Sequence, residues 1–127
     1  MFEKEKKEIL KACLQMKEYQ LISLTGGNVS LKIDDETYLV TPSGMLYEEM
    51  TYEDICVIDH ECNLKEGCRK PSSDSTALIY IFDKMPKVRS IIHTHQPYAT
   101  AIGLTNDSLP ACMVTLIDAN HARINVA

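Results

Sequence analysis

Apolar residues recur every three or four positions near the start of the chain. Ile9, Ala12, Cys13 and Met16 fall at positions i, i+3, i+4 and i+7, and lysines and glutamates occupy many of the places between them. This spacing lines up the apolar side chains on one face of a helix. The segment is therefore predicted to be an amphipathic helix that packs on the core.

The pattern changes to strict alternation after a pair of glycines at 26–27. Apolar and polar residues alternate over 29–33, which predicts a strand with one buried face. Asp34-Asp35 is expected to turn the chain and Thr37–Thr41 to return as the second strand of a hairpin. Pro42-Ser43-Gly44 then ends that strand, because proline and glycine favour turns.

The rest of the chain reads as strands and helices in alternation. We expect strands over 55–58, 88–95 and 113–117, a turn and return over 59–67, and helices over 77–85 and from 96 to about 104. Hydroxyl and carboxylate residues at 71–74 suit a helix N-terminus. Residues 124–127 alternate again, like a strand cut off by the end of the chain. This order predicts one α/β domain over 1–127, built around a mixed sheet.

Composition narrows the range of partners. The chain has 127 residues and a formal net charge of −5, which argues against nucleic acids or anionic membranes as partners. It has no apolar run near the roughly 20 residues of a membrane span, and its densely charged N-terminus does not resemble a secretion signal. We therefore expect a cytoplasmic protein. Its five scattered cysteines, without a C-x-x-C pair, are expected to be free thiols.

The most specific chemical signal is His93-Thr94-His95, within the strand expected over 88–95. Residues i and i+2 of a strand project from the same face, so the two imidazoles would lie side by side. Paired imidazoles on one rigid element are a common way to bind zinc. Two structural or surface histidines are the alternative interpretation of the same pattern.

Three loops of small and hydroxyl-bearing residues accompany the histidines. They are Thr25-Gly26-Gly27-Asn28, Thr41-Pro42-Ser43-Gly44 and Lys70-Pro71-Ser72-Ser73-Asp74. Each has a simple structural explanation as a turn, a strand end or a helix cap. If they converge, however, their hydroxyls and backbone N–H groups would form a cradle for a phosphate ester, since a helix N-terminus favours anions.

Four motifs together resemble the class II aldolase/adducin family, whose members include fuculose-1-phosphate aldolases and ribulose-5-phosphate 4-epimerases. They are Gly26-Gly27-Asn28-Val29-Ser30, Thr41-Pro42-Ser43-Gly44, Lys70-Pro71-Ser72-Ser73-Asp74 and the segment 93–101, and they span nearly the whole chain in the family's order. The resemblance implies a three-layer α/β/α sandwich with a mixed, mostly antiparallel sheet. It also implies a homo-oligomer, commonly a cyclic tetramer with active sites between neighbouring subunits.

The resemblance further implies a zinc enzyme that acts on a phosphorylated sugar. His93 and His95 match two of the family's three zinc histidines, and Asp74 stands where the aldolases carry an acid/base glutamate. The phosphate-binding positions of the family match Thr25, Asn28, Ser43, Gly44, Ser72 and Ser73.

Two departures from the family leave the function open. The third zinc histidine of the family would lie beyond Ala127, so we expect the chain to lack the family's C-terminal part; His60 and His121 are in no matching motif. Asp74 is one methylene shorter than glutamate.

The preferred prediction is zinc-dependent aldol cleavage of a ketose 1-phosphate such as fuculose 1-phosphate. The alternatives are a sugar-phosphate epimerase or dehydratase, and a non-catalytic remnant comparable to the adducin head. We expect an incomplete sheet to cause self-association.

Overall fold

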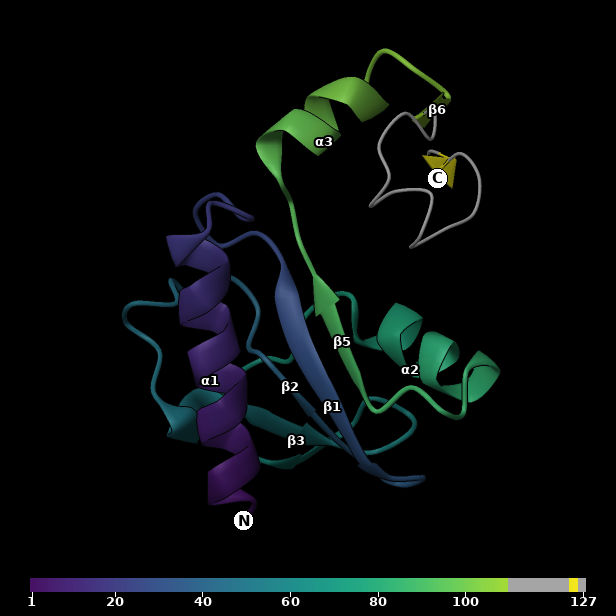
Figure 1. Ribbon diagram of the computed structural model, residues 1–127. Helices are drawn as coiled ribbons and strands as arrows, with labels where there is room; N and C mark the ends of the chain where they lie inside the picture. The colour runs from purple at the N-terminus through teal and green to yellow at the C-terminus, as the bar shows by residue number, and fades with distance from the viewer. Residues whose placement is uncertain (110–123, 126–127) are drawn as a thin grey trace. The chain divides into compact units, whose positions relative to one another are not determined.

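The computed structural model describes residues 1–109 and 124–125, and the chain divides into two units, Met1–Thr94 and His95–Ala127. The first unit contains a five-stranded sheet in the order β4-β3-β2-β1-β5, in which every neighbouring pair is antiparallel (Figure 1). Its strands are β1 (Asn28–Asp34), β2 (Thr37–Val40), β3 (Cys56–Ile58), β4 (Leu64–Glu66) and β5 (Ser90–His93). Its helices are α1 (Glu3–Glu18), the short 3-10 helix η1 (Tyr52–Asp54) and α2 (Ser75–Lys84).

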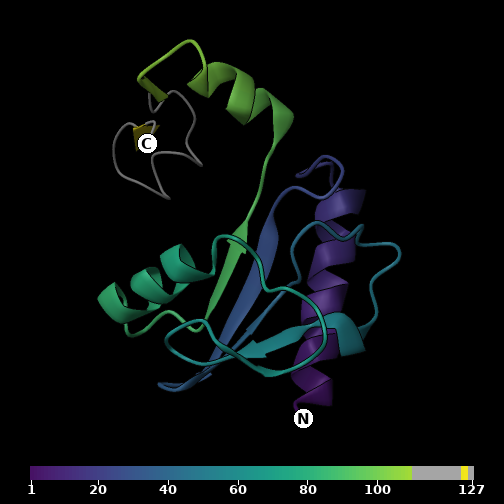
Figure 2. The ribbon, with the colours of Figure 1, turned by 180° about the vertical axis from the view of Figure 1, so that it is seen from behind.

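The two long helices of this unit cover opposite faces of the sheet, as the views from the front and from behind both show (Figures 1 and 2). One apolar cluster joins α1 to the sheet and contains Ile9, Cys13, Met16, Val29, Leu39 and Val57. The other joins α2 to the opposite face and contains Tyr38, Val40, Cys56, Ile58, Leu78, Ile79 and Phe82. The division follows from the alternation of side chains along each strand. The predicted α/β fold class, with helix layers on both sides of the sheet, is confirmed, but the pairs among the described strands are all antiparallel, whereas a mixed sheet was expected.

Strand β1 differs from the prediction because both of its faces are covered. Ser30 and Lys32 were expected on a solvent face and Asn28 in the preceding loop, yet each is at most 8% exposed. They lie on the side that α2 covers, where burial without partners would be costly. The Ser30 hydroxyl donates to the Ile91 carbonyl at 3.5 Å, and the Lys32 ammonium pairs with Asp35 at 2.8 Å. Local partners therefore allow a polar stripe to be buried.

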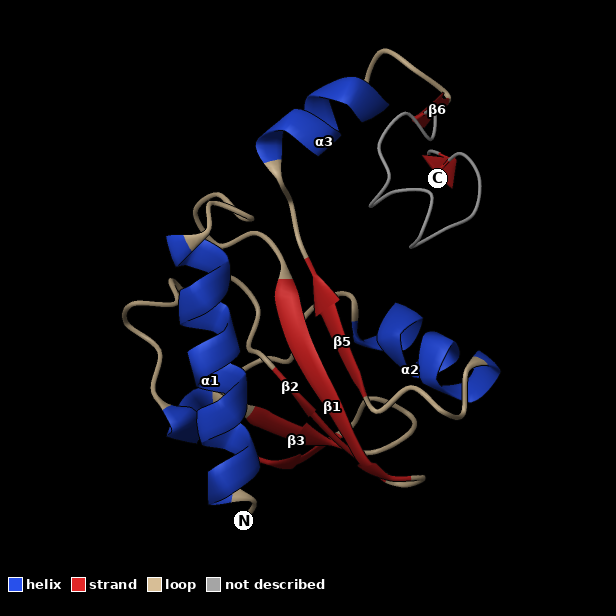
Figure 3. Ribbon diagram, in the orientation of Figure 1, coloured by secondary structure: helices blue, strands red, loops and turns tan. Residues whose placement is uncertain are grey.

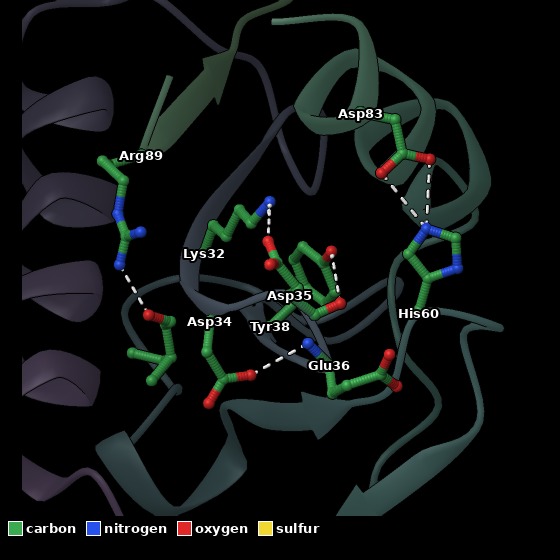
Figure 4. A network of polar contacts seen from close by, with 9 residues as sticks. Lys32, Asp34, Asp35, Glu36, Tyr38, His60, Asp83 and Arg89 are labelled. Carbon is green, nitrogen blue, oxygen red and sulfur yellow. Dashed lines mark hydrogen bonds and ion pairs between the residues drawn. The ribbon is translucent and has the colours of Figure 1, made fainter. Parts of the chain in front are cut away.

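A polar network occupies the hairpin-turn end of β1 and β2 (Figure 4). The Tyr38 hydroxyl donates to the Asp35 carbonyl at 3.1 Å, and Arg89 donates to the Ile33 carbonyl. His60, in the turn after β3, lies 3.0 Å from the Asp83 carboxylate of α2. These contacts stabilise the hairpin-turn end of the sheet, which is opposite to the end where β1 begins.

The remaining predicted elements of the first unit are observed with shifted bounds (Figure 3). The turn and return over 59–67 contains β4, and the helix expected over 77–85 begins two residues earlier. The strand expected over 88–95 is shorter, because Val88 still bonds to the turn that leaves α2 and Gln96 already caps the next helix. It therefore ends at His93. As the edge of the sheet, β5 leaves Ile92 56% exposed, but self-association remains a prediction.

The second unit contains α3 (Pro97–Gly103) and a pair of short antiparallel strands, β6 (Ser108–Leu109) and β7 (Ile124–Asn125). The predicted helix start is observed: the Gln96 side chain accepts a hydrogen bond from the Ala99 N–H at 2.7 Å. The strand expected over 113–117, together with Cys112 and His121, lies outside the described residues. None of the described helices combines the length and apolar character needed to cross a bilayer.

The cysteines within the described residues are free thiols, as predicted. Cys13 and Cys56 are buried in the two apolar clusters, and this burial raises the pKa of Cys13 to about 12 and that of Cys56 to about 11. Both thiols therefore stay protonated and act as small apolar side chains.

Replacing Phe82 should test how much α2 contributes to stability. Phe82 is fully buried against Tyr38, with ring centroids 5.6 Å apart. Phe82→Ala should lower the free energy of unfolding by about 3–5 kcal/mol, since it removes a large buried ring and leaves a cavity. Tyr80→Ala, on the same helix but at a 63% exposed site, should change it by less than about 0.5 kcal/mol. Urea unfolding measures both, and equal losses would contradict this packing.

Two glycines in the left-handed region provide a second test. Gly27 has φ +83°, and a Cβ there would lie 2.6 Å from the His93 carbonyl oxygen; Gly44 has φ +70° with no atom within 4 Å of such a Cβ. Gly44→Ala should cost about 1–2 kcal/mol from backbone strain alone. Gly27→Ala should cost about 1–3 kcal/mol more, because the methyl group collides with backbone. Urea midpoints that rank the two variants the other way would show that the loop does not pack against β5.

Candidate functional site

The glycine loop before β1 lies directly against the end of β5. Gly27 has no room for a side chain next to the His93 carbonyl, and the adjacent Asn28 faces His93 in the β1–β5 register. The Tyr47 hydroxyl donates to the Gly27 carbonyl at 2.7 Å, and burial raises the pKa of Tyr47, so this donor stays protonated. The loop is thus held in place from two sides.

The second and third loops are tied to each other by their backbones. The Ser43 N–H donates to the Lys70 carbonyl at 2.8 Å, and the Ser72 N–H donates to the Thr41 carbonyl at 3.1 Å. Thr41 also accepts the Val29 N–H on its hydroxyl, at 3.3 Å, which joins this pair of loops to β1. All three predicted loops therefore meet at the end of the sheet where β1 begins and β2 and β5 end.

A chain of polar contacts links the loops to the predicted catalytic residues. The Asn28 Nδ2 donates to Asp74 Oδ2 at 2.7 Å, and the same oxygen lies 3.9 Å from His93 Nε2. Asn28 is 1% exposed, whereas the side chains of Asp74 and His93 are close to half exposed. The arrangement therefore presents a carboxylate and an imidazole to solvent above a buried amide.

The other predicted phosphate-binding residues surround this group. Thr25, Ser43, Gly44 and Ser73 are exposed, and Ser72 is partly buried at the start of α2. The Ser72 hydroxyl accepts the Asp74 N–H at 3.3 Å. Because these hydroxyls are exposed, an anion can reach them without any rearrangement of buried side chains.

Sequence reasoning singled out Lys70 as part of the third loop but missed its neighbour Arg69. A hollow of about 440 Å³ is lined by Pro42, Ser43, Gly44, Met45, Leu46, Glu49, Arg69 and Lys70. Arg69 is held by Asp54, with 2.8 Å between Nε and Oδ1. Burial of the Asp54 carboxyl raises its pKa, but hydrogen bonds from Thr51 and Arg69 outweigh this effect and leave the pKa below its usual value. Only the proximity of Arg69 to the motif at 70–74 could have suggested it.

The donor set for a metal ion is partial. His93 ends β5, and His95 follows in the other unit, so the strand geometry that would place two imidazoles side by side does not extend to His95. Within residues 1–109 and 124–125, no three His, Cys, Asp or Glu side chains are grouped so as to hold a metal. His60 pairs with Asp83 instead, and His121 lies outside the described residues. The described residues thus offer zinc donors of the right type but no complete set of three protein ligands.

Comparison with known proteins gives consistent matches. The family described as Class II Aldolase and Adducin N-terminal domain matches residues 7–127. The chain is 35% identical over 118 residues to L-ribulose-5-phosphate 4-epimerase UlaF of Salmonella paratyphi B. The aligned region covers 91% of this chain and 51% of that protein.

Solved structures give the same result. A structure of L-fuculose 1-phosphate aldolase is 34% identical with a TM-score of 0.77, over 84% of this chain and 50% of that one. The L-fuculose 1-phosphate aldolase of Thermus thermophilus has the same fold, with 21% identity and a TM-score of 0.76. The match covers 92% of this chain and 59% of the Thermus chain. The chain spans about half the length of the first two proteins. The family match, which covers nearly the whole chain, shows that this protein belongs to the class II aldolase/adducin family.

Proposed function

We propose that this chain binds a phosphorylated sugar and supplies part of the active site of a metal-dependent enzyme that acts on it. The observation that carries the proposal is the linkage of Asn28, Asp74 and His93, with 2.7 Å and 3.9 Å between the facing atoms, at the point where the three loops meet. A sugar phosphate needs anion donors beside groups that act on carbonyl and hydroxyl oxygens, and this end of the sheet offers both.

The phosphate would be bound by the loops. Thr25, Ser43 and Ser73 carry exposed hydroxyls, and Gly44 leaves its backbone open to an approaching ligand. Ser72 and Ser73 precede α2, whose N-terminal dipole favours an anion. Lys70, on the rim of the neighbouring hollow, would add electrostatic attraction.

The reacting end of the sugar would lie near His93 and Asp74. We propose His93 and His95 as two ligands of a zinc ion whose remaining ligands come from outside the described residues; the bound metal would act as a Lewis acid toward the sugar's oxygens. The Asp74 carboxylate would accept or return a proton at the sugar carbon or hydroxyl. Its position on a helix end, fixed by Asn28, keeps that carboxylate near the imidazole.

Two reactions fit this site. Aldol cleavage of a ketose 1-phosphate such as fuculose 1-phosphate is favoured by the 34% identical aldolase structure, and epimerisation of a pentulose 5-phosphate by the 35% identical epimerase. Both need a phosphate anchor and a proton-transferring group. They differ in whether the carbon skeleton of the product is shorter than that of the substrate.

Metal content and turnover test the proposal together. Purified protein should contain zinc, and with zinc it should either cleave fuculose 1-phosphate or epimerise ribulose 5-phosphate. His93→Ala should lower both bound zinc and turnover by at least about 100-fold, because it removes a ligand and misplaces the reacting groups. His60→Ala should leave both unchanged, since His60 pairs with Asp83 instead. Zinc content by mass spectrometry that is equal in all three proteins would contradict the metal assignment.

Inorganic phosphate alone tests the anchor. Ser73→Ala should weaken phosphate binding about tenfold or more, since a hydrogen bond to a charged group contributes roughly 1.5–3 kcal/mol. Ser90→Ala is the matched control, because Ser90 is also exposed but starts β5 at the other end from His93. Titration calorimetry measures the affinities. Phosphate that binds equally well to both variants would place the anchor elsewhere.

A further inference from the structure

Tyr47 places a hydroxyl group in a buried position beside the first loop. The residue is 2% exposed, and its ring packs in the apolar cluster between α1 and the sheet. Its hydroxyl donates to the Gly27 carbonyl oxygen at 2.7 Å and lies 3.4 Å from the Gly26 carbonyl oxygen. A phenylalanine ring would fill the same apolar space, so what tyrosine adds here is the contact with the glycine backbone.

Tyr47 follows the second loop by three residues and connects that loop to the first one. Before the second loop, Thr41 accepts the Val29 N–H on its hydroxyl at 3.3 Å and donates its own N–H to the Val29 carbonyl at 3.2 Å. After the second loop, Tyr47 bonds to the glycine loop. The segment 41–47 is therefore attached at both of its ends, to β1 and to the loop that precedes β1.

The glycine loop depends on attachments of this kind. Its two adjacent glycines have no Cβ, and glycine has the widest range of backbone conformations. The Tyr47 hydroxyl bonds to the peptide unit that joins Gly27 to Asn28, and Asn28 pairs with His93 in the sheet. This peptide unit is thus held from both sides. Because Thr25 lies only two residues before Gly27, the same contacts limit where its exposed hydroxyl can lie.

An ordered loop favours binding of a small anion. A loop that becomes ordered only when the ligand binds loses conformational freedom at that moment, and this loss lowers the affinity. Phosphate makes few contacts, so its affinity is sensitive to such a loss. The hydroxyl of Tyr47 therefore affects binding although the side chain is buried and is not open to the ligand.

We propose that Tyr47 is a positioning residue whose hydroxyl holds the glycine loop at 26–27 in the conformation that binds the phosphate of the sugar, without contacting the phosphate. This rests on the proposed function, in which the three loops bind that phosphate. It extends the binding site from the exposed hydroxyls to a buried one that lies outside the four sequence motifs.

The main test compares Tyr47→Phe with Tyr38→Phe. Tyr38 is also buried and also donates to a backbone carbonyl, that of Asp35 at 3.1 Å, but at the hairpin-turn end of the sheet (Figure 4). Each variant loses one hydroxyl and one hydrogen bond, so both should lower the midpoint of urea unfolding to a similar extent. Only Tyr47→Phe should weaken inorganic phosphate binding, by about threefold to tenfold, the factor expected for one neutral hydrogen bond.

Kinetics separate positioning from direct action in the reaction. On the sugar phosphate that the wild type converts, Tyr47→Phe should raise KM by about the same factor as the dissociation constant of phosphate and leave kcat within about twofold. A fall in kcat at unchanged KM would overturn the proposal, because the hydroxyl would then act on the reacting groups. Equal loss of phosphate affinity in both tyrosine variants would also overturn it, since a general loss of stability would explain the effect.

A spectroscopic readout does not depend on turnover. The chain has five glycines, so selective ¹⁵N-glycine labelling gives few amide resonances to assign. Those of Gly26 and Gly27 should be single and sharp in the wild type and in Tyr38→Phe. In Tyr47→Phe they should broaden or double and become single again at saturating phosphate, while Gly67, which lies against Cys56 in the sheet, should not change.

The outcomes distinguish the proposed function from the role of Tyr47. A wild type that binds no inorganic phosphate and converts no sugar phosphate would overturn the proposed function. A wild type that binds phosphate no more tightly than Tyr47→Phe would overturn only the positioning role. Unchanged Gly26 and Gly27 resonances in phosphate-free Tyr47→Phe would overturn that role as well, because the loop would then be ordered without the hydroxyl.

Discussion

Strand β1 hydrogen-bonds along both of its edges, to β2 on one side and to β5 on the other, and the arrangement of the loops depends on this double pairing. Antiparallel neighbours place the start of one strand beside the end of the next. The register sets Asn28 opposite His93 and Ser30 opposite Val40, so the last residues of β2 and β5 lie beside the glycine loop. A shift of one residue would turn Asn28 toward α1 and separate it from Asp74.

Two aspartates beside helical turns show how differently one residue type is used: Asp54 is the last residue of η1, and Asp74 precedes α2. Asp54 accepts hydrogen bonds from the Thr51 N–H and hydroxyl at 2.9 and 2.8 Å and also pairs with Arg69, so its carboxylate stabilises a local turn. Asp74, which precedes α2, accepts a hydrogen bond from Asn28 instead and faces His93. The first arrangement uses the carboxylate for folding. The second keeps it half exposed and available to a ligand.

Much of the fold followed from periodicity alone. The spacing of Ile9, Cys13 and Met16 predicted α1, and the alternation over 29–33 with the Asp34-Asp35 turn predicted the β1–β2 hairpin, because both patterns reflect which side chains meet the core. The bounds of β5 could not be predicted in this way. The flanking residues 88–89 and 94–95 contain no glycine or proline that would mark its ends, which depend on the turn after α2 and on the cap that Gln96 provides for α3.

The sequence by itself determined the fold class, the order of elements and the family motifs, because each depends on residues close together in the chain. Only the tertiary structure decided that Asn28 and Asp74, 46 residues apart, form one hydrogen bond, and that Ser30 and Lys32 are buried. Packing of α2 over the polar side of β1 produces both results. Alternating polarity identifies the side of a strand with fewer apolar groups, but it cannot tell whether water or a helix covers that side.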